Sequence, residues 1–429
     1  MSFSDQEFDD VRDERESKAF RVVKNTFKGI LYGASALVWI LVLAVLLLLG
    51  QELLVDYFEN PPAKMYADKH IVASTLDTDR VKEIAVSEKA DLICTACTDQ
   101  ALLSVAKVSE ELGLPCYISY QTGLNVTNKL YMKKVLVSNN IPTSRYVILD
   151  KMDSEALKDF SCPLVVKPVD CNSSKGVKRI DNIEELPTYL NEAINYSRTK
   201  TAIVEEFKEG TEISADFYIE NGVAKYLSAT TSLKIKNRKS FTILCSDYPA
   251  INNSQKEKLT TIVSQIAKAF NLDNCPMLVQ LIANGDDMWV LEFSARMGGG
   301  SKHNLIKVLS DVDIMSVYVD RILGDYPSIH PSEPVKYCKM IYIYCKPGIF
   351  NYVEGFESLQ KEGIIDTYFH YKTSGMEIHG SETSSDRPAG YLITASTAEE
   401  LARKLQYADS HLAVISADGE DIMLHNLLS

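Results

Sequence analysis

The chain has 429 residues, a formal net charge of −13 and 46% hydrophobic residues. This length corresponds to about three domains of roughly 150 residues each. The composition excludes disordered, collagen-like and coiled-coil chains, and the acidic excess argues against a nucleic-acid binder. A mean hydropathy near zero excludes a polytopic membrane protein.

The N-terminal fifty residues differ from this average. Residues 1–28 form a charged tail, and residues 29–50 contain no charged side chain. The uncharged run is long enough to cross a bilayer as a helix, which takes about 20 residues. No small-residue cleavage site follows it, so an anchor fits better than a cleaved signal. We therefore predict a transmembrane helix at 29–50 and a membrane-associated protein with a cytoplasmic catalytic domain.

A second interpretation of the same run stays open. It also fits the first strand, glycine turn and helix of a Rossmann-like domain, with Gly33 in the turn and Asp56 at the end of the second strand. On this interpretation the protein is cytoplasmic and soluble. The difficulty is that a helix covering an open sheet keeps one polar face, and this segment has none.

Short apolar runs alternate with helical stretches over residues 51–125, which predicts a parallel sheet. The predicted strands are 52–57, 70–74, 90–96 and 114–119, and the predicted helices are 78–89 and 99–112.

Strands dominate the rest of the chain. Helices are predicted at 128–140, 253–270 and 397–408. The predicted strands are 144–150, 162–169, 201–207, 212–219, 224–233, 339–345, 365–371 and 389–395, with a hairpin of 277–284 and 288–295 around Gly285.

Two segments carry residues suited to binding a nucleotide. Lys167 ends a buried apolar run, and the loop after it contains Ser173, Ser174 and Lys175, which can present amides and an ammonium group to phosphate. By itself, this loop also fits an ordinary polar hairpin.

The second segment contains carboxylates at the end of an apolar strand. Glu205 could accept a hydrogen bond from an adenine amino group, and Glu212, seven residues later, could reach ribose hydroxyls. Exposed glutamates at a strand edge are the alternative.

The predicted hairpin places polar residues on one sheet face. Glu292, Ser294 and Arg296 alternate along the second strand, and Gln280 interrupts the apolar first strand. Oxygen ligands of this kind suit Mg²⁺ bridged to phosphates, and the arginine could neutralise an acyl phosphate or a carboxylate. A solvated sheet face is the alternative. The glycine-rich run 298–301 would let a substrate approach the backbone.

Taken in this order, the three segments resemble the ATP-grasp family, most closely its biotin carboxylase-like and carbamoyl-phosphate synthase large-chain-like members, which include carboxylate–amine ligases. The resemblance covers roughly residues 51–429. It implies mixed α/β and α+β structure: a Rossmann-like pre-ATP domain at 51–125, an ATP-grasp domain at 126–330 and a small C-terminal α+β domain at 331–429. The ATP-grasp domain would have two lobes, at about 126–200 and 201–330.

The resemblance also implies roles for individual residues. Lys129, Lys167 and the loop residues Ser173, Ser174 and Lys175 would hold ATP phosphates. Glu205 and Phe207 would lie at the adenine, and Glu212 at the ribose.

Glu292 would hold Mg²⁺ with help from Gln280 and Ser294, and Arg296 would act with Lys167 in catalysis. Gln280 stands where many members have a glutamate, and Ser294 where many have an asparagine. One or two Mg²⁺ ions are therefore expected, and Mn²⁺ could replace them.

The implied reaction is ATP-dependent activation of a carboxylate as an acyl phosphate, followed by attack of an amine. The implied partners are these two small molecules, with no nucleic acid, and membrane anchoring through 29–50. The oligomeric state is left open, with a homodimer as one option. A phosphotransferase, a carbamoyl-phosphate-type enzyme and a membrane-tethered nucleotide-binding regulator are the alternatives. Five residues are candidates for the substrate site, although each is equally explained as a surface charge: Lys234, Arg238, Lys302, His303 and Arg387.

Overall fold

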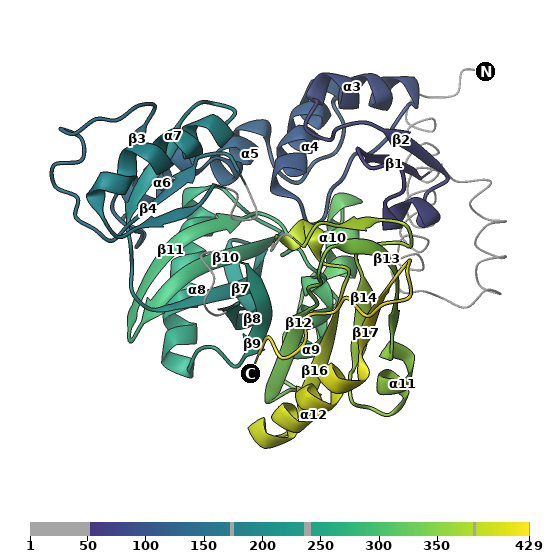
Figure 1. Cartoon of the computed structure of the whole chain (residues 1–429). Coiled ribbons are helices and arrows are strands. Elements are labelled where there is room, and N and C mark those ends of the chain that lie inside the picture. Colours follow the sequence, from purple (N-terminus) through teal and green to yellow (C-terminus); the bar gives the residue numbers. More distant parts are fainter. Residues whose placement is uncertain (1–51, 172–175, 236–241, 381–382, 429) are drawn as a thin grey trace, which may run out of the picture.

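The computed structural model describes residues 52–171, 176–235, 242–380 and 383–428. Figure 1 shows three groups of elements around a central region: the N-terminal helices α3 and α4, a lobe containing β3, β4 and α7, and a large sheet that continues into the C-terminal part of the chain.

The N-terminal group contains a parallel pair of strands, as the sequence predicts. In it, β1 (Leu53–Asp56) pairs with β2 (Lys69–Val72), and helices α3 (Thr78–Ser87) and α4 (Asp99–Leu112) follow. The sequence-predicted helix boundaries agree closely with these.

Two predicted strands in this group were wrong. Residues 90–96 and 114–119 form no strand. Their polar groups bond elsewhere in the fold: the Thr95 carbonyl accepts a hydrogen bond from the Tyr318 hydroxyl at 2.6 Å, and the Tyr117 hydroxyl donates to the Ala295 carbonyl at 2.8 Å. These contacts hold the first segment to the helix that contains Tyr318 and the second to the backbone at Ala295.

A four-stranded sheet with the order β3-β6-β4-β5 forms the second lobe. Helix α7 (Leu186–Tyr196) covers it, and its buried leucines and alanine pack on apolar residues of β4 and β6. The strands are β3 (Tyr146–Leu149), β4 (Leu164–Pro168), β5 (Lys178–Ile180) and β6 (Ala202–Glu206).

The predicted helix at 128–140 is present as α6 (Lys129–Ser138), and a separate helix, α5 (Tyr120–Thr127), precedes it. Asn128 separates the two helices, because its extended backbone ends α5 while its side chain caps the start of α6.

The large sheet has eight strands in the order β11-β10-β7-β8-β9-β12-β16-β14. Its strands are β7 (Thr211–Glu220), β8 (Val223–Lys234), β9 (Ile243–Tyr248), β10 (Cys275–Asn284), β11 (Asp287–Ser294), β12 (Tyr337–Tyr342), β14 (Thr367–His370) and β16 (Ala389–Ala395). The predicted hairpin is β10–β11.

Helix α8 (Asn253–Ala269) packs against the large sheet. It begins with a capping box between Asn252 and Gln255. Its buried residues then recur every three or four positions, which gives one apolar stripe. These residues are Leu259, Ile262, Val263 and Ile266. They join the main core on the face of β10 that carries Val279 and Leu281.

The C-terminal residues share this sheet with the preceding part of the chain. β9 pairs with β12 in an antiparallel ladder, so the sheet runs across the predicted boundary at residue 331. Helices α9 (Lys302–Ser310), α10 (Ile314–Ile322), α11 (Phe356–Lys361) and α12 (Ala398–His411), and a small sheet of β15 (Glu377–Ile378), β13 (Gly348–Glu354) and β17 (Ala413–Ser416), complete the fold. The division into domains stays a prediction.

The membrane prediction requires correction. Residues 29–50, to which the transmembrane helix was assigned, lie outside the described residues. Within the described part of the chain, no helix has both the length and the apolar character needed to cross a bilayer. We therefore withdraw the transmembrane helix, the membrane anchoring and the membrane-associated localisation.

A glycine joins the two sheets. Gly210 lies between β6 and β7 with a φ of +148°, and a Cβ atom there would meet the Ala283 carbonyl oxygen of β10 at 2.4 Å. That oxygen belongs to a strand backbone and cannot move aside cheaply.

We expect Gly210→Ala to lower the free energy of unfolding by about 3 kcal/mol, because it combines backbone strain with a backbone clash. Urea denaturation would measure this loss. Gly222→Ala is the matched control: its φ is also positive, at +75°, but no heavy atom lies within 4 Å of the added Cβ, so a loss of about 1 kcal/mol is expected. Equal losses would contradict the role of the Ala283 contact.

Candidate active site

A cavity of about 310 Å³ lies on the face of the large sheet that carries Gln280. Residues of six neighbouring strands, β11 to β12 in the sheet order, line it, together with residues of α4 and α6. Strands five positions apart can face one cavity only if the sheet curls, so the cavity is the concave side of a curled sheet.

Polar side chains run across this concave side in register. Glu292 of β11 lies opposite Gln280 of β10, Gln280 lies opposite Ser214 of β7, and Ser214 lies opposite Thr230 of β8. One pleat further along β8, Ser232 lies opposite Ser246 of β9. The polar groups on this side of the sheet are therefore one carboxylate, one amide and several small hydroxyl groups.

The structure brings the predicted metal and catalytic residues of the hairpin together. Gln280 and Glu292 face each other across the ladder, as the sequence analysis anticipated. Glu292, Ser294 and Arg296 all line the cavity, which follows from their period-two spacing.

Asp99 is a site residue that the sequence analysis missed. It is the first residue of α4, and its carboxylate accepts hydrogen bonds from Arg296 Nε at 2.7 Å, from a second guanidinium nitrogen of Arg296 and from the Ser294 hydroxyl. An aspartate at a helix start usually serves as a favourable charge for the helix, so its sequence position gave no sign of this contact.

Lys129 links α6 to Glu292 of β11. Its Nζ lies 3.0 Å from the Glu292 carboxylate and donates to the Cys171 carbonyl at 3.0 Å. The side chain is buried, and burial alone would lower its pKa; the Glu292 carboxylate outweighs burial and raises the pKa of Lys129.

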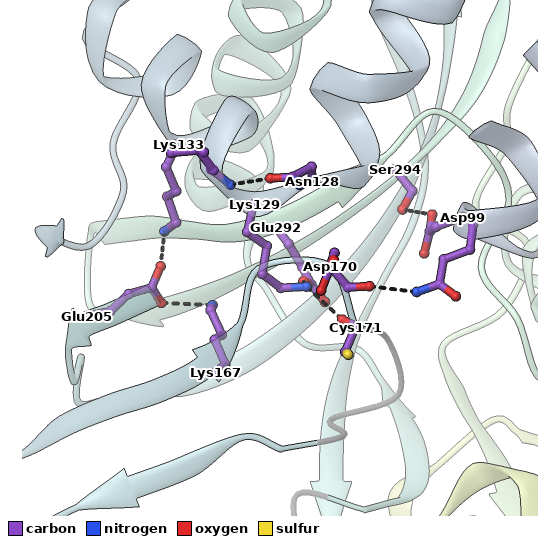
Figure 2. A network of polar contacts seen from close by, with 12 residues as sticks. Asp99, Asn128, Lys129, Lys133, Lys167, Asp170, Cys171, Glu205, Glu292 and Ser294 are labelled. Carbon is purple, nitrogen blue, oxygen red and sulfur yellow. Dashed lines mark hydrogen bonds and ion pairs between the residues drawn. The ribbon is translucent and has the colours of Figure 1, made fainter. Parts of the chain in front are cut away.

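Glu205 lies at the centre of an ion cluster, which Figure 2 shows beside the Lys129–Glu292 pair. Its two carboxylate oxygens pair with Lys133 Nζ of α6 and Lys167 Nζ of β4, each at 2.8 Å. Burial opposes ionisation of Glu205, but the two ammonium groups outweigh burial and lower its pKa to about 2.

Lys133 is the second missed residue. Its side chain is fully buried, and besides Glu205 it contacts the Thr143 hydroxyl at 2.5 Å. Burial, as the larger influence, lowers the pKa of Lys133. The signal was available in the sequence, because Lys133 follows Lys129 by four residues and so lies on the same helix face.

Two other predicted residues do not line the cavity. Phe207 follows β6 and stacks under the Arg179 guanidinium, 4.1 Å from the ring centroid. Glu212 is the second residue of β7 and pairs with Lys234. Ser173, Ser174 and Lys175 lie outside the described residues.

The glycine-rich run borders the cavity through Gly298 and Gly299. Gly300 has a φ of +67°, and a Cβ there would meet the Tyr342 hydroxyl at 3.0 Å. Lys302 and Arg387 also line the cavity and are both buried, which excludes the surface-charge explanation for them.

Known proteins resemble this chain in sequence and in fold. The family model described as an ATP-grasp domain matches residues 160–304. Phosphoribosylamine–glycine ligase of Pyrococcus furiosus is 24% identical over 315 residues, which cover 67% of this chain and 71% of the relative.

Two solved structures share the fold. The biotin carboxylase domain of 2-oxoglutarate carboxylase from Hydrogenobacter thermophilus, solved with MgADP, ADP and bicarbonate, has a TM-score of 0.71 at 18% identity; the match covers 88% of this chain and 86% of that one. L-amino acid ligase from Bacillus licheniformis has a TM-score of 0.67 at 22% identity, covering 84% and 90%. The fold is thus that of ATP-grasp proteins. Residues 160–304 match the ATP-grasp domain, and the chain is similar to ligases that carry this domain.

We expect Glu205→Gln to lower the free energy of unfolding by about 3–5 kcal/mol at pH 7, because it leaves Lys133 buried without a counter-ion. The native-state pKa of about 2 lies below the ordinary value of 4.5. The stabilisation by Glu205 is therefore complete above pH 4.5 and is lost as the pH falls toward 2.

Urea denaturation between pH 7 and pH 3 would measure both effects. The difference in free energy of unfolding between wild type and variant should narrow as the pH falls. Glu206→Gln is the matched control. Glu206 pairs with Arg145 and Lys208 near the surface, so its loss should cost no more than about 1 kcal/mol. A gap that stays constant with pH would contradict the role given to Glu205.

Proposed function

We propose that this protein is an ATP-dependent ligase that activates a carboxylate as an acyl phosphate for attack by an amine, with release of ADP and phosphate. The observation that carries the proposal is the pairing of Glu292 with Gln280 across β10 and β11, beside the ammonium group of Lys129. Oxygen ligands next to a buried cation suit a magnesium-bound triphosphate.

The relatives support this reaction class. Phosphoribosylamine–glycine ligase and L-amino acid ligase are both named as ligases, and each name includes an amino acid. The carboxylase domain was solved with MgADP and bicarbonate, a small carboxylic anion.

In this proposal Lys129 and Lys167 hold phosphate oxygens, and Ser173, Ser174 and Lys175 cover them. Phosphoryl transfer depends mainly on positioning and charge neutralisation, which such cations supply. Phe207 and Glu212 contact the nucleoside. Glu205 orients Lys167 through their ion pair, which fits its contacts better than direct adenine binding.

The residues present fit one strongly held metal ion. Glu292 offers a carboxylate and Gln280 an amide oxygen. Among the described residues, no three histidine, cysteine or acidic side chains gather as a metal site. Magnesium bound to nucleotide usually takes one or two protein carboxylates and otherwise phosphate and water oxygens, so Glu292 would be the principal protein ligand.

Arg296 would neutralise the acyl phosphate. Asp99 holds the guanidinium at two points, so the arginine is oriented before substrate arrives. Ser294 donates to the same carboxylate. We therefore assign Ser294 to supporting Asp99 as well as to the metal environment.

Glu292→Ala should abolish ADP formation, because the metal loses its carboxylate ligand, while the fold stays intact by circular dichroism. ADP release would be screened over pairs of amino acids and small carboxylates. Asp287→Ala is the control, since Asp287 lies on the same strand at its exposed end and should leave turnover unchanged.

Unchanged turnover in Glu292→Ala would overturn the metal assignment. ATP binding without ADP release across the whole screen would favour a nucleotide-binding regulator. ADP release that needs no amine would favour a phosphotransferase or a carbamoyl-phosphate-type enzyme.

Gln280→Glu should lower the Mg²⁺ concentration needed for half-maximal ADP formation by about tenfold, because a charged oxygen replaces a neutral one opposite Glu292. A magnesium titration of the initial rate would measure it. Gln255→Glu, which changes a glutamine in the α8 capping box, should leave the half-maximal concentration unchanged. An identical titration for Gln280→Glu and wild type would remove Gln280 from the metal site.

A further inference from the structure

Arg387 reaches the cavity from the C-terminal part of the chain. It lies between the 3-10 helix η3 (Ser384–Asp386) and β16, and only 8% of the residue is exposed. Its Nε donates to the Tyr344 hydroxyl at 2.6 Å and a terminal nitrogen donates to the Ile243 carbonyl at 2.7 Å. The guanidinium stacks on the Tyr342 ring, 3.9 Å from its centroid. The group is therefore rigidly oriented.

Within the described residues, the charge of Arg387 is not balanced by a carboxylate. Three other cations of the cavity each have a partner: Lys129 pairs with Glu292, Arg296 with Asp99, and Lys302 with Asp216. Across the described ranges, no acidic group lies within ion-pair distance of Arg387.

The adjacent carboxylate does not fill this role. One oxygen of Asp386 accepts a hydrogen bond from the His379 amide at 3.0 Å and makes no ion pair with Arg387. A buried cation without a counter-ion is costly. An anionic ligand would remove that cost.

A second observation points to a ligand in the same cavity. Ser232 lines it and is 6% exposed, yet its hydroxyl has no hydrogen-bond partner in the described part of the protein. Its neighbour across the ladder is Ser246, which also lines the cavity. Buried hydroxyls are normally bonded, and an exception calls for an explanation.

We propose that Arg387 and Ser232 bind a carboxylate group of the amine substrate, so that the amine is an amino acid. A planar carboxylate matches the guanidinium fork and can accept a further hydrogen bond from a hydroxyl. That the bound molecule is the amine substrate rests on the proposed ligase function.

Position in the sheet separates this carboxylate from the one that is activated. The activated group must lie by the phosphates at Lys129 and Glu292, on the β11 side. Ser232 is on β8, and the contacts of Arg387 are with residues at β9 and β12, toward the other side of the cavity. Two different functional groups can therefore bind at once.

The test is binding, measured on the full chain with Mg²⁺ and a non-hydrolysable ATP analogue. Each common L-amino acid and its carboxamide would be screened by the shift in thermal midpoint and then titrated by calorimetry. We expect at least one free amino acid to bind and its amide to bind at least about tenfold more weakly, since the amide lacks the charge.

Arg387→Met should weaken binding of that amino acid at least about tenfold and leave binding of its amide unchanged. Arg321→Met is the matched control. Arg321 also donates to a backbone carbonyl and stacks on a tyrosine, Tyr326, but it does not line the cavity. Its substitution should leave the affinity for the amino acid unchanged.

Ser232→Ala keeps the proposal testable if the arginine variant fails to fold. Removing an unpaired buried hydroxyl should leave the unliganded protein as stable as wild type or more so, while the affinity for the amino acid falls several-fold. Ser109→Ala is the control, because the Ser109 hydroxyl is likewise buried without a partner but lies in α4, outside the cavity lining. It should leave binding unchanged.

The proposal is overturned if no free amino acid binds, if acid and amide bind equally, or if both cavity variants bind the amino acid as wild type does. Failure of the ligase function is a separate result. Amino-acid binding without ADP release would keep this subsite and remove the ligase, whereas ADP release only with amines that lack a carboxylate would do the opposite.

Discussion

A buried ion cluster centred on Glu205 joins parts of the chain that are distant in sequence. Lys133 comes from α6, Lys167 from β4 and Glu205 from β6. Lys133 also contacts Thr143, whose hydroxyl donates to the Val290 carbonyl of β11 at 2.6 Å. Because three charges are buried together, each depends on the other two. The position of α6, and with it Lys129 at its start, is set by this cluster.

The charges in the cavity are mostly neutralised within the protein before any ligand arrives. Asp99 neutralises Arg296, and Glu292 neutralises Lys129. A triphosphate with its metal ion would replace these partners with its own charges, so binding exchanges ion pairs instead of filling empty positions. Arg387 has no carboxylate partner among the described residues, and this difference distinguishes the two sides of the cavity.

Sequence reasoning located the elements whose pattern is local. The β10–β11 hairpin and its facing residues Gln280 and Glu292 follow from strand periodicity, and α4 and α8 from their helical sequence patterns. Sequence reasoning failed at 90–96 and 114–119, where an apolar run resembles a strand. These segments are held by hydrogen bonds of tyrosine side chains and not by a strand ladder.

The missed parts of the site depend on contacts between distant segments. Asp99 and Arg296 are 197 residues apart, and nothing near Asp99 in the sequence indicates an arginine. The hydroxyl groups of the cavity floor are equally hidden, because Ser214, Ser232 and Ser246 are unremarkable in their own strands. Only the register between strands brings them to one face of the sheet.

The ladder between β9 and β12 has a consequence for substrate size. It makes the β11 edge, with Glu292, and the β12 edge, with Tyr342, parts of one hydrogen-bonded sheet. The span between them is then fixed by the curl of that sheet. The four-stranded lobe joins this sheet through the connection at Gly210 and through the contact between Thr143 and Val290. In the proposed ligation, this fixed span would limit the combined length of the two reactants.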